Sequence, residues 1–333
     1  MHCYCPRILQ VAAVLFCILS SGILVAQTDL DQVHIVPRAM PVADAIEPSA
    51  VPSSHSGLIR RDVDLVMVPV TITDTTGRLV TGLQKQNFKV FEEKQKQEIR
   101  SFSNEDTPIS VGIVLDTSGS METKIARAKE AVAEFCNTAN PQDQFFLITF
   151  SDTPNADSGF TSNAQDIQNK LAFITPKGNT SLLDAVYLGI EKMRHASQPR
   201  KALIVISDGG DNHSRYTENE IKSAVREADI TLFSIGIYDS YFSTQEERLG
   251  PQLMSDLADS TGGMSFTLDN PNDLPLVANQ IGRVLRDQYV LAYHPKNAKH
   301  DGRWHKIKVK LLLPKGLPYL VVHAKNGYYA ASE

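Results

Sequence analysis

The fold can be argued from one stretch of sequence, Ile109-Ser-Val-Gly-Ile-Val-Leu-Asp116-Thr-Ser118-Gly-Ser120-Met121. Before the acid, Ile, Val and Leu stand at both odd and even positions, which predicts a strand buried on both faces. A helical pattern follows directly, so this strand is expected to belong to a parallel sheet. Asp116, Ser118 and Ser120 then place a carboxylate and two hydroxyls at alternate positions of a tight turn, where all three can face one point. Three hard oxygen donors without a second adjacent acid favour Mg²⁺ over a calcium cage.

Two segments far along the chain also place a polar residue at the end of an element. Residues 178–185, Gly-Asn-Thr-Ser-Leu-Leu-Asp-Ala, open a predicted helix, and Thr180 stands in the turn before it. Residues 201–210, Lys-Ala-Leu-Ile-Val-Ile-Ser-Asp-Gly-Gly, form a second predicted buried strand that ends at Asp208 and a pair of glycines. Ligands of open α/β sheets bind beyond the carboxyl ends of the strands. Asp116 and Asp208 therefore meet at such a place if their strands are neighbours.

These positions resemble the metal-ion-dependent adhesion site of von Willebrand factor A domains. The match runs through Asp-x-Ser-x-Ser, a Gly-x-Thr turn and a strand-terminal Asp-Gly, with the residues Asp116, Ser118, Ser120, Thr180 and Asp208. The resemblance implies that Ser118 and Ser120 bind a cation directly, that the other three bind it directly or through water, and that one coordination position stays open. The implied cation is Mg²⁺, with Mn²⁺ or Ca²⁺ as alternatives. A helix N-cap is a competing interpretation, but it accounts only for the first three residues.

Over about residues 62–330, the chain resembles secreted bacterial von Willebrand factor A-related proteins of the acidobacterial type. Besides the site, it is carried by Val-Pro-Val-Thr-Ile-Thr-Asp at 68–74 and by Tyr-Val-Leu-Ala-Tyr-His-Pro at 289–295. Strand and helix patterns alternate over residues 108–287. This alternation predicts an α/β fold, a doubly wound and mostly parallel sheet of the Rossmann-like type that the resemblance also implies.

Two β-rich segments flank this α/β region. Residues 62–107 and 288–330 each carry short strand patterns, but neither has enough strands for a stable sheet of its own. We therefore expect the two segments to pair with each other as a small β-sandwich beside the α/β domain. Pro69, inside the first strand pattern, predicts an edge strand or a bulge. Residues 27–61 carry four prolines and few large apolar side chains, which predicts a flexible linker.

The start of the chain predicts export. Residues 1–26 combine Arg7, an apolar run and small residues up to Ala26, which is the pattern of a secretory signal cleaved after Ala26. Ser-Ser-Gly at 20–22 interrupts the run too early for a membrane anchor, so we expect a periplasmic or extracellular protein with no transmembrane span after cleavage. The mature chain would keep Cys136 alone, at a spacing that predicts a buried core thiol. Its 32 basic and 38 acidic residues, a net charge of −6, give no support to nucleic-acid binding.

The predicted site favours recognition over catalysis. We expect an exported, non-catalytic binding or adhesion module, in which an Asp or Glu carboxylate of a protein partner completes the coordination of the cation. One alternative is a Mg²⁺-dependent hydrolase similar to a phosphatase, but that pattern needs a second Asp where Ser118 stands. Another is a structural scaffold with a vestigial site, in which Asp116 and Asp208 would repel each other. A glycan ligand and the oligomeric state are left open.

Three further features bear on the site and on its surroundings. Asp211 and Asn212, beside Asp208, could hold a second cation or form a solvated acidic loop. His305 lies in a polar context that favours a surface position. The helix predicted at 272–286 is apolar on one face and runs directly into a predicted strand. A shift of this helix could therefore carry partner binding to the β-sandwich, which we state as a hypothesis.

Overall fold

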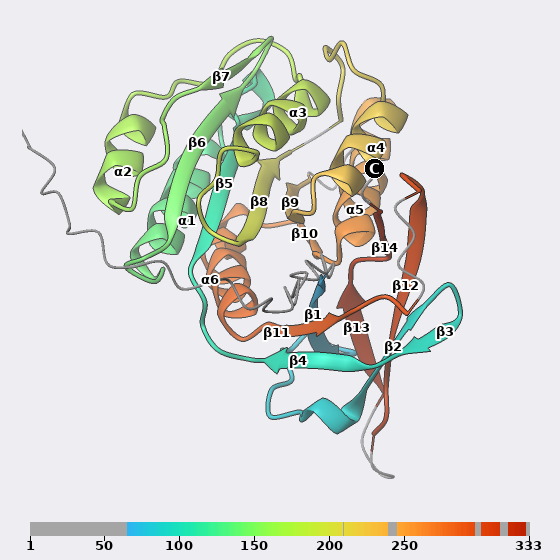
Figure 1. Cartoon of the computed structure of the whole chain (residues 1–333). Helices are drawn as coiled ribbons and strands as arrows, with labels where there is room; N and C mark the ends of the chain where they lie inside the picture. Colours follow the sequence, from blue (N-terminus) through green and yellow to red (C-terminus); the bar gives the residue numbers. More distant parts are fainter. Residues whose placement is uncertain (1–64, 209, 239–244, 297–300, 314–318, 331–333) are drawn as a thin grey trace, which may run out of the picture. The chain divides into compact units, whose positions relative to one another are not determined.

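The computed structural model describes residues 65–208, 210–238, 245–296, 301–313 and 319–330 (Figure 1). The predicted signal peptide at 1–26 and the predicted linker at 27–61 lie outside these residues. Within the described part of the chain, no helix is both long enough and apolar enough to cross a membrane.

A six-stranded sheet forms the centre of the α/β domain. Its strand order is β10-β9-β8-β5-β6-β7, and only β7 runs antiparallel to its neighbour. All residues of β5 are buried, as expected for a strand with neighbours on both sides. The bounds are β5 Ile109–Asp116, β6 Gln144–Phe150, β7 Pro154–Ala156, β8 Arg200–Ser207, β9 Thr231–Ile237 and β10 Ser265–Leu268.

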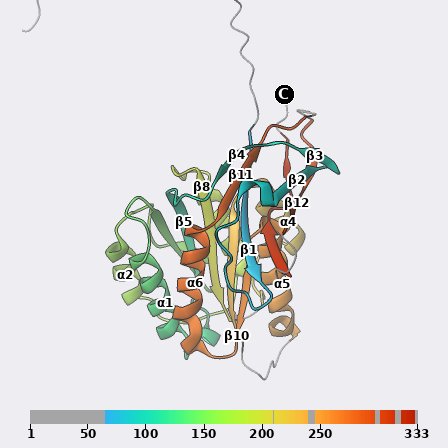
Figure 2. The same cartoon turned by 90° about the horizontal axis from the view of Figure 1, so that it is seen from below.

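Helices cover both faces of this sheet (Figures 1 and 2). On one face, α1, α2 and α6 share an apolar core with the strands, and on the other face α3, α4 and α5 do so. The predicted doubly wound and mostly parallel α/β sheet is therefore confirmed. The bounds are α1 Ile125–Asn137, α2 Ala164–Ala172, α3 Leu182–Met193, α4 Glu218–Glu227, α5 Gln245–Thr261 and α6 Leu274–Arg286, with the 3₁₀ turns η2 Gly119–Met121 and η3 Pro271–Asp273.

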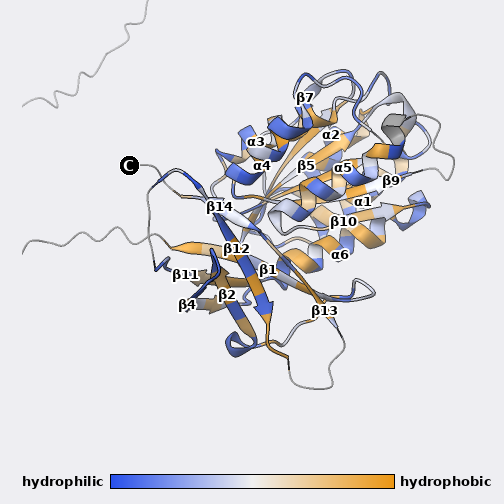
Figure 3. Ribbon diagram, turned by 90° about the vertical axis from the view of Figure 1, so that its right-hand side faces the viewer, coloured by the Kyte–Doolittle hydropathy of each residue, from blue (hydrophilic) through white to orange (hydrophobic). Residues whose placement is uncertain are grey.

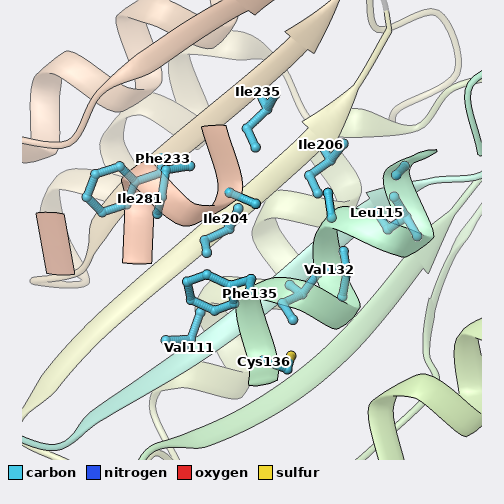
Figure 4. Packing of buried hydrophobic residues seen from close by; sticks show 14 of the residues in the cluster. Val111, Leu115, Val132, Phe135, Cys136, Ile204, Ile206, Phe233, Ile235 and Ile281 are labelled. Carbon is cyan, nitrogen blue, oxygen red and sulfur yellow. The ribbon is translucent and has the colours of Figure 1, made fainter. Parts of the chain in front are cut away.

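Figure 4 shows the core under α1 and α6. Phe135 of α1 and Ile281 of α6 lie over Ile204 and Phe233 of the sheet, and all four are buried. Cys136 is buried in the same cluster, and this burial raises the pKa of its thiol to about 12. The predicted buried core thiol is therefore confirmed, and it is protonated at neutral pH.

Two four-stranded antiparallel sheets form a β-sandwich. Their strand orders are β13-β1-β11-β4 and β14-β12-β2-β3. Both sheets join strands that precede residue 109 to strands that follow residue 287, and their apolar side chains share a third core. The predicted sandwich is therefore confirmed. The bounds are β1 Val66–Asp74, β2 Phe88–Glu92, β3 Gln95–Gln97, β4 Ile99–Ser103, β11 Tyr289–Tyr293, β12 Trp304–Leu311, β13 Leu320–Ala324 and β14 Gly327–Tyr329, with the 3₁₀ turn η1 Lys85–Asn87.

Strand β12 corrects the expectation for His305. Its even-numbered lysines are exposed, which gives the strand a largely hydrophilic colour in Figure 3, while Ile307 and His305 belong to the buried alternation. His305 is 7% exposed, with Nδ1 lying 3.0 Å from Glu92 Oε1 and Nε2 lying 3.2 Å from Asp301 Oδ1. The predicted surface position was wrong, because two carboxylates satisfy the imidazole inside the sandwich.

Pro69 is accommodated by a local edge. In its sheet, β1 lies between β13 and β11, so it is not an edge strand as a whole. However, β13 pairs only with residues 70–74, while β11 pairs with residues 66–70. At Pro69, therefore, one side of β1 has no partner strand among the described residues. A proline at this position removes no ladder hydrogen bond on that side.

Polar contacts join the sandwich to the α/β domain. Gln280 Nε2 of α6 donates to Gly77 O at 2.9 Å, and Lys325 Nζ lies 2.5 Å from Asp229 Oδ1. Beside the first contact, a cleft of about 960 Å³ lies between α6 and residues 76–81. The helix predicted to carry a conformational signal is thus in contact with the sandwich through its side chains as well as through its chain connection.

Candidate metal centre

Asp116 ends the central strand β5 and is fully buried. Its Oδ1 accepts from Ser118 N at 2.8 Å, and its Oδ2 accepts from Ser207 Oγ at 2.5 Å. Burial raises the pKa of Asp116 to about 6, against the lowering effect of both serines, and the nearby charge of Asp208 raises it further. The carboxylate is therefore ionised at neutral pH but is held in a position where a positive charge would stabilise it.

Four of the predicted ligands form one hydrogen-bonded chain. Ser118 N donates to Asp116, Ser118 Oγ lies 3.1 Å from Ser120 Oγ, and Ser120 Oγ donates to Asp208 Oδ1 at 2.8 Å. The 3₁₀ turn η2 carries Ser120, and its Met121 N donates to Ser118 O at 3.1 Å. Because β5 and β8 are neighbouring parallel strands, Asp116 and Asp208 come to the same edge of the sheet, as the sequence predicts.

Thr180 reaches this edge through its backbone. Gly119 N donates to Gly178 O at 3.0 Å, which joins the Thr180 loop to the serine turn. Thr180 N donates to Asn212 Oδ1 at 3.0 Å, and Asn212 N and His213 N each donate to Thr180 O at 3.1 Å. Thr180 is 6% exposed, and among the described residues no hydrogen bond joins its side chain to the other four predicted ligands. The Thr180 loop therefore lies at the site, but the Thr180 hydroxyl is not part of the hydrogen-bonded chain from Asp116 to Asp208.

Asp211 and Asn212 hold the loops of the site in place. Asp211 Oδ1 accepts from Leu183 N at 3.2 Å, at the start of α3, and from Ser214 Oγ at 2.5 Å. Burial raises the pKa of Asp211, against the lowering effect of these hydrogen bonds. Asn212 is bound to Thr180, so both side chains have protein partners, while Asp211 is half-buried and Asn212 is exposed. A second cation here stays a prediction.

Two residues at the site were missed by the sequence analysis. Ser207 donates to Asp116, and Lys124 Nζ lies 2.9 Å from Asp208 Oδ2. A signal existed for Lys124, because it stands four residues after Ser120 at the start of a predicted helix, so both point to one side. Ser207 directly precedes Asp208 at the end of a buried strand, and nothing in the local pattern distinguishes it from other buried serines.

The donor chemistry fits a hard divalent cation. The predicted ligands offer two carboxylates and three hydroxyls, and Mg²⁺, Mn²⁺ and Ca²⁺ prefer such oxygen donors. In the described part of the chain, no three side chains of His, Cys, Asp or Glu come together as a metal cluster. A cation at this edge would therefore depend on the hydroxyl oxygens as well as on the two carboxylates.

Comparisons with known proteins agree with this geometry. Residues 111–210 match the von Willebrand factor type A domain. The human inter-alpha-trypsin inhibitor heavy chain H4 is 26% identical over 215 residues, which are 58% of this chain and 22% of that protein, so the chain spans about a fifth of its curated relative.

Among solved structures, the von Willebrand factor type A protein from Catenulispora acidiphila is 12% identical, with a TM-score of 0.48, over 82% of this chain and 75% of that chain. Proximal thread matrix protein 1 from the mussel byssus, solved with a zinc-occupied MIDAS motif, is 18% identical, with a TM-score of 0.45, over 58% of this chain and 49% of that chain. On the match of residues 111–210 and the doubly wound sheet that contains them, the chain contains a von Willebrand factor type A domain.

Proposed function

We propose that this protein is an exported, non-catalytic binding module that recognises a protein partner through a divalent cation. The observation that carries the proposal is the hydrogen-bonded chain from Asp116 through Ser118 and Ser120 to Asp208, at the carboxyl ends of two neighbouring strands. The cation would be Mg²⁺, with Mn²⁺ or Ca²⁺ as alternatives. Its ligands would be Asp116, Ser118, Ser120, Thr180 and Asp208.

Each group in this set has a separate part. The carboxylates of Asp116 and Asp208 would balance the charge of a divalent cation, while the hydroxyls of Ser118, Ser120 and Thr180 would supply neutral oxygen donors. A bound cation would offer an open coordination position to an Asp or Glu carboxylate of the partner. Four of the five ligands are buried and Ser120 is exposed, so the site is partly shielded from water and this charge-assisted contact would be stronger than one at an open surface.

A binding role is also supported by the curated relative, which is named as a heavy chain of a trypsin inhibitor and not as an enzyme. Export is supported by the signal pattern of residues 1–26. We propose a periplasmic or extracellular location on that pattern. Fractionation of cells that express the tagged protein checks it, and retention in the cytoplasm with residues 1–26 uncleaved would contradict it.

The proposed recognition can be tested by capture of envelope and culture-medium proteins on immobilised protein. We expect a partner that is retained in Mg²⁺, released by a chelator and absent with Asp208→Asn. The matched control is Asp273→Asn, because Asp273 is an exposed acid with no capping hydrogen bond at the start of α6. The partner should lose binding when its own acidic residues are replaced by amides. Capture that a chelator does not change, or turnover of a phosphate ester by the purified protein, would contradict the proposal.

A further inference from the structure

Lys124 is buried next to the candidate metal centre. Its Nζ lies 2.9 Å from Asp208 Oδ2, with side-chain exposures of 7% for Lys124 and 2% for Asp208. Both side chains of this ion pair are below 10% exposure. In the other lysine and arginine ion pairs of the described residues, at least one side chain is more exposed. A buried ammonium needs a carboxylate partner, and Asp208 provides one for Lys124 in the metal-free chain.

The local fold brings Lys124 to this carboxylate. Lys124 precedes α1, and its backbone N donates to Met121 O at 2.9 Å, which continues the turn that begins at Ser118. Ser120 and Lys124 therefore reach Asp208 from the same short segment. Ser120 Oγ donates to Oδ1, and Lys124 Nζ lies beside Oδ2, so both oxygens of Asp208 have a donor.

The charges of Asp116, Asp208 and Lys124 affect how strongly the site attracts a divalent cation. Asp116 and Asp208 carry two negative charges and Lys124 carries one positive charge. Counted over these three side chains, a divalent cation meets a net charge of −1 with Lys124 and −2 without it. The ammonium group repels the cation, so Lys124 weakens the attraction of the two carboxylates for it.

We propose that Lys124 is a built-in counter-ion of the candidate site, which stabilises Asp208 in the metal-free chain and lowers the affinity for the divalent cation. This inference rests on the proposed function, because it concerns the same site. A purely structural lysine would contribute to the stability of the turn and leave the metal affinity unchanged, and this difference makes the two roles separable.

The test compares Lys124→Met, Lys124→Arg and the matched control Lys129→Met. Lys129 lies in the helix α1 that Lys124 precedes and is half-buried, but its Nζ donates to the backbone oxygen of Ile174 at 2.8 Å. Calorimetry gives the Kd for Mg²⁺, and thermal unfolding with and without Mg²⁺ gives the Tm. At an effective dielectric constant of about 20, removal of the buried positive charge beside Asp208 should lower the Kd about tenfold or more.

The inference predicts a lower metal-free Tm for Lys124→Met, a larger rise of Tm in Mg²⁺ than in the original protein, and a tighter Kd. Lys124→Arg keeps the charge and should keep the original Kd, and Lys129→Met should change the Tm alone. Should Lys124→Met not fold, Lys124→Gln carries the same expectation, since its amide can still donate to Asp208.

The outcomes separate this inference from the proposed function. If the original protein binds Mg²⁺ and folded Lys124→Met binds it with an equal or weaker Kd, the role of Lys124 is overturned and the proposed function stands. If Lys124→Met binds Mg²⁺ where the original protein does not, the counter-ion role is supported. If neither protein binds a divalent cation, both proposals fail.

Discussion

At the residue scale, the candidate site depends on hydroxyl groups that hold buried carboxylates. Ser207 Oγ donates to Asp116 Oδ2 at 2.5 Å, and Ser120 Oγ donates to Asp208 Oδ1 at 2.8 Å. Asp116 is fully buried, so each of these hydrogen bonds replaces one that water would make in the unfolded chain. Removal of a hydroxyl leaves a buried carboxylate oxygen short of a donor.

Ser207→Ala should lower the free energy of unfolding at pH 7 by about 1–3 kcal/mol, the usual cost of an unsatisfied buried acceptor. Urea unfolding measures this change. Ser234→Ala is the matched control, because Ser234 is equally buried on the neighbouring strand β9 and donates to the Met254 backbone oxygen at 3.2 Å. The control should lose less, since its acceptor is uncharged. Equal losses in the two variants would contradict a special dependence of Asp116 on Ser207.

Residue types and their order were enough to propose the predicted ligands, because each stands at the end of a strand or the start of a helix. The spacing of Lys124 from Ser120 places it on the side of the site, but its burial could not be predicted, since a lysine before a helix is normally exposed and Asp208 comes from a distant strand. The same holds for His305, whose partner Glu92 lies far away in sequence. His305 stands on the buried side of the β12 alternation, but the carboxylates that allow a polar residue there come from other parts of the chain.

At the element scale, β12 and β2 enclose a buried polar group in the apolar sandwich. His305 lies between Glu92 and Asp301, and Tyr328 Oη donates to Glu92 Oε1 at 3.4 Å. Tyr293 is also buried here, and neither its Oη nor Glu92 Oε2 has a hydrogen-bond partner among the described residues. Burial alone would lower the pKa of His305, but the hydrogen bonds and charges of Glu92 and Asp301 outweigh it and raise the pKa.

Because the folded pKa of His305 is raised, the histidine stabilises the fold most at low pH. Its contribution is present in full below the unfolded pKa of about 6.5 and is lost as the pH rises through the folded pKa. His305→Gln should therefore cost more free energy of unfolding at pH 6 than at pH 8.5. Urea unfolding at both pH values checks this, with His195→Gln as an exposed control. An equal cost at the two pH values would contradict the raised pKa.

Long elements were easier to predict than short ones. The alternation of β12 and the buried run of β5 indicate strands directly, because their patterns extend over many residues. The short strand β7 was missed, since its three residues, Pro-Asn-Ala, have no strand pattern and the strand depends on its pairing with β6. Helix α5, Gln245–Thr261, contains Pro251, although a proline normally marks the start or the end of a helix.

At the scale of the whole molecule, the β-sandwich and the α/β domain meet through close backbone contacts. Gly262 follows α5 with φ of +79°, and a Cβ there would lie 2.4 Å from the backbone carbonyl carbon of Ala324. Gly82 has nearly the same φ, +82°, with no atom within 4 Å of such a Cβ. The two glycines therefore share one backbone conformation and differ in their surroundings.

Gly82→Ala should cost about 1–2 kcal/mol of unfolding free energy, which is the strain of a left-handed alanine. Gly262→Ala should cost about 1–3 kcal/mol more, because the added methyl group must push the sandwich backbone away from the α/β domain. Urea unfolding of both variants gives the difference. Equal costs would contradict the close contact between Gly262 and Ala324.

The pairing of the two chain ends could be predicted from strand counts, since neither flanking segment can form a stable sheet alone. The strand order, the register and the division into two sheets could not be predicted. They depend on side-chain packing between residues such as Val66 and Tyr293, which are more than 200 positions apart. The hypothesis that α6 carries a signal to the sandwich stays a prediction. The hydrogen bond between Gln280 of α6 and Gly77 is the first place at which to engineer a clamp that holds α6 to the sandwich.

The central claim is a divalent cation at the carboxyl ends of β5 and β8. It is tested most directly by calorimetric titration of Mg²⁺ and Mn²⁺ into chelator-treated protein, with the variants Asp116→Asn and Asp208→Asn and the control Asp273→Asn. We predict one equivalent of bound cation in the original protein and in the control, and none in the two site variants. Binding that survives Asp116→Asn and Asp208→Asn, or no binding in the original protein, would contradict the claim.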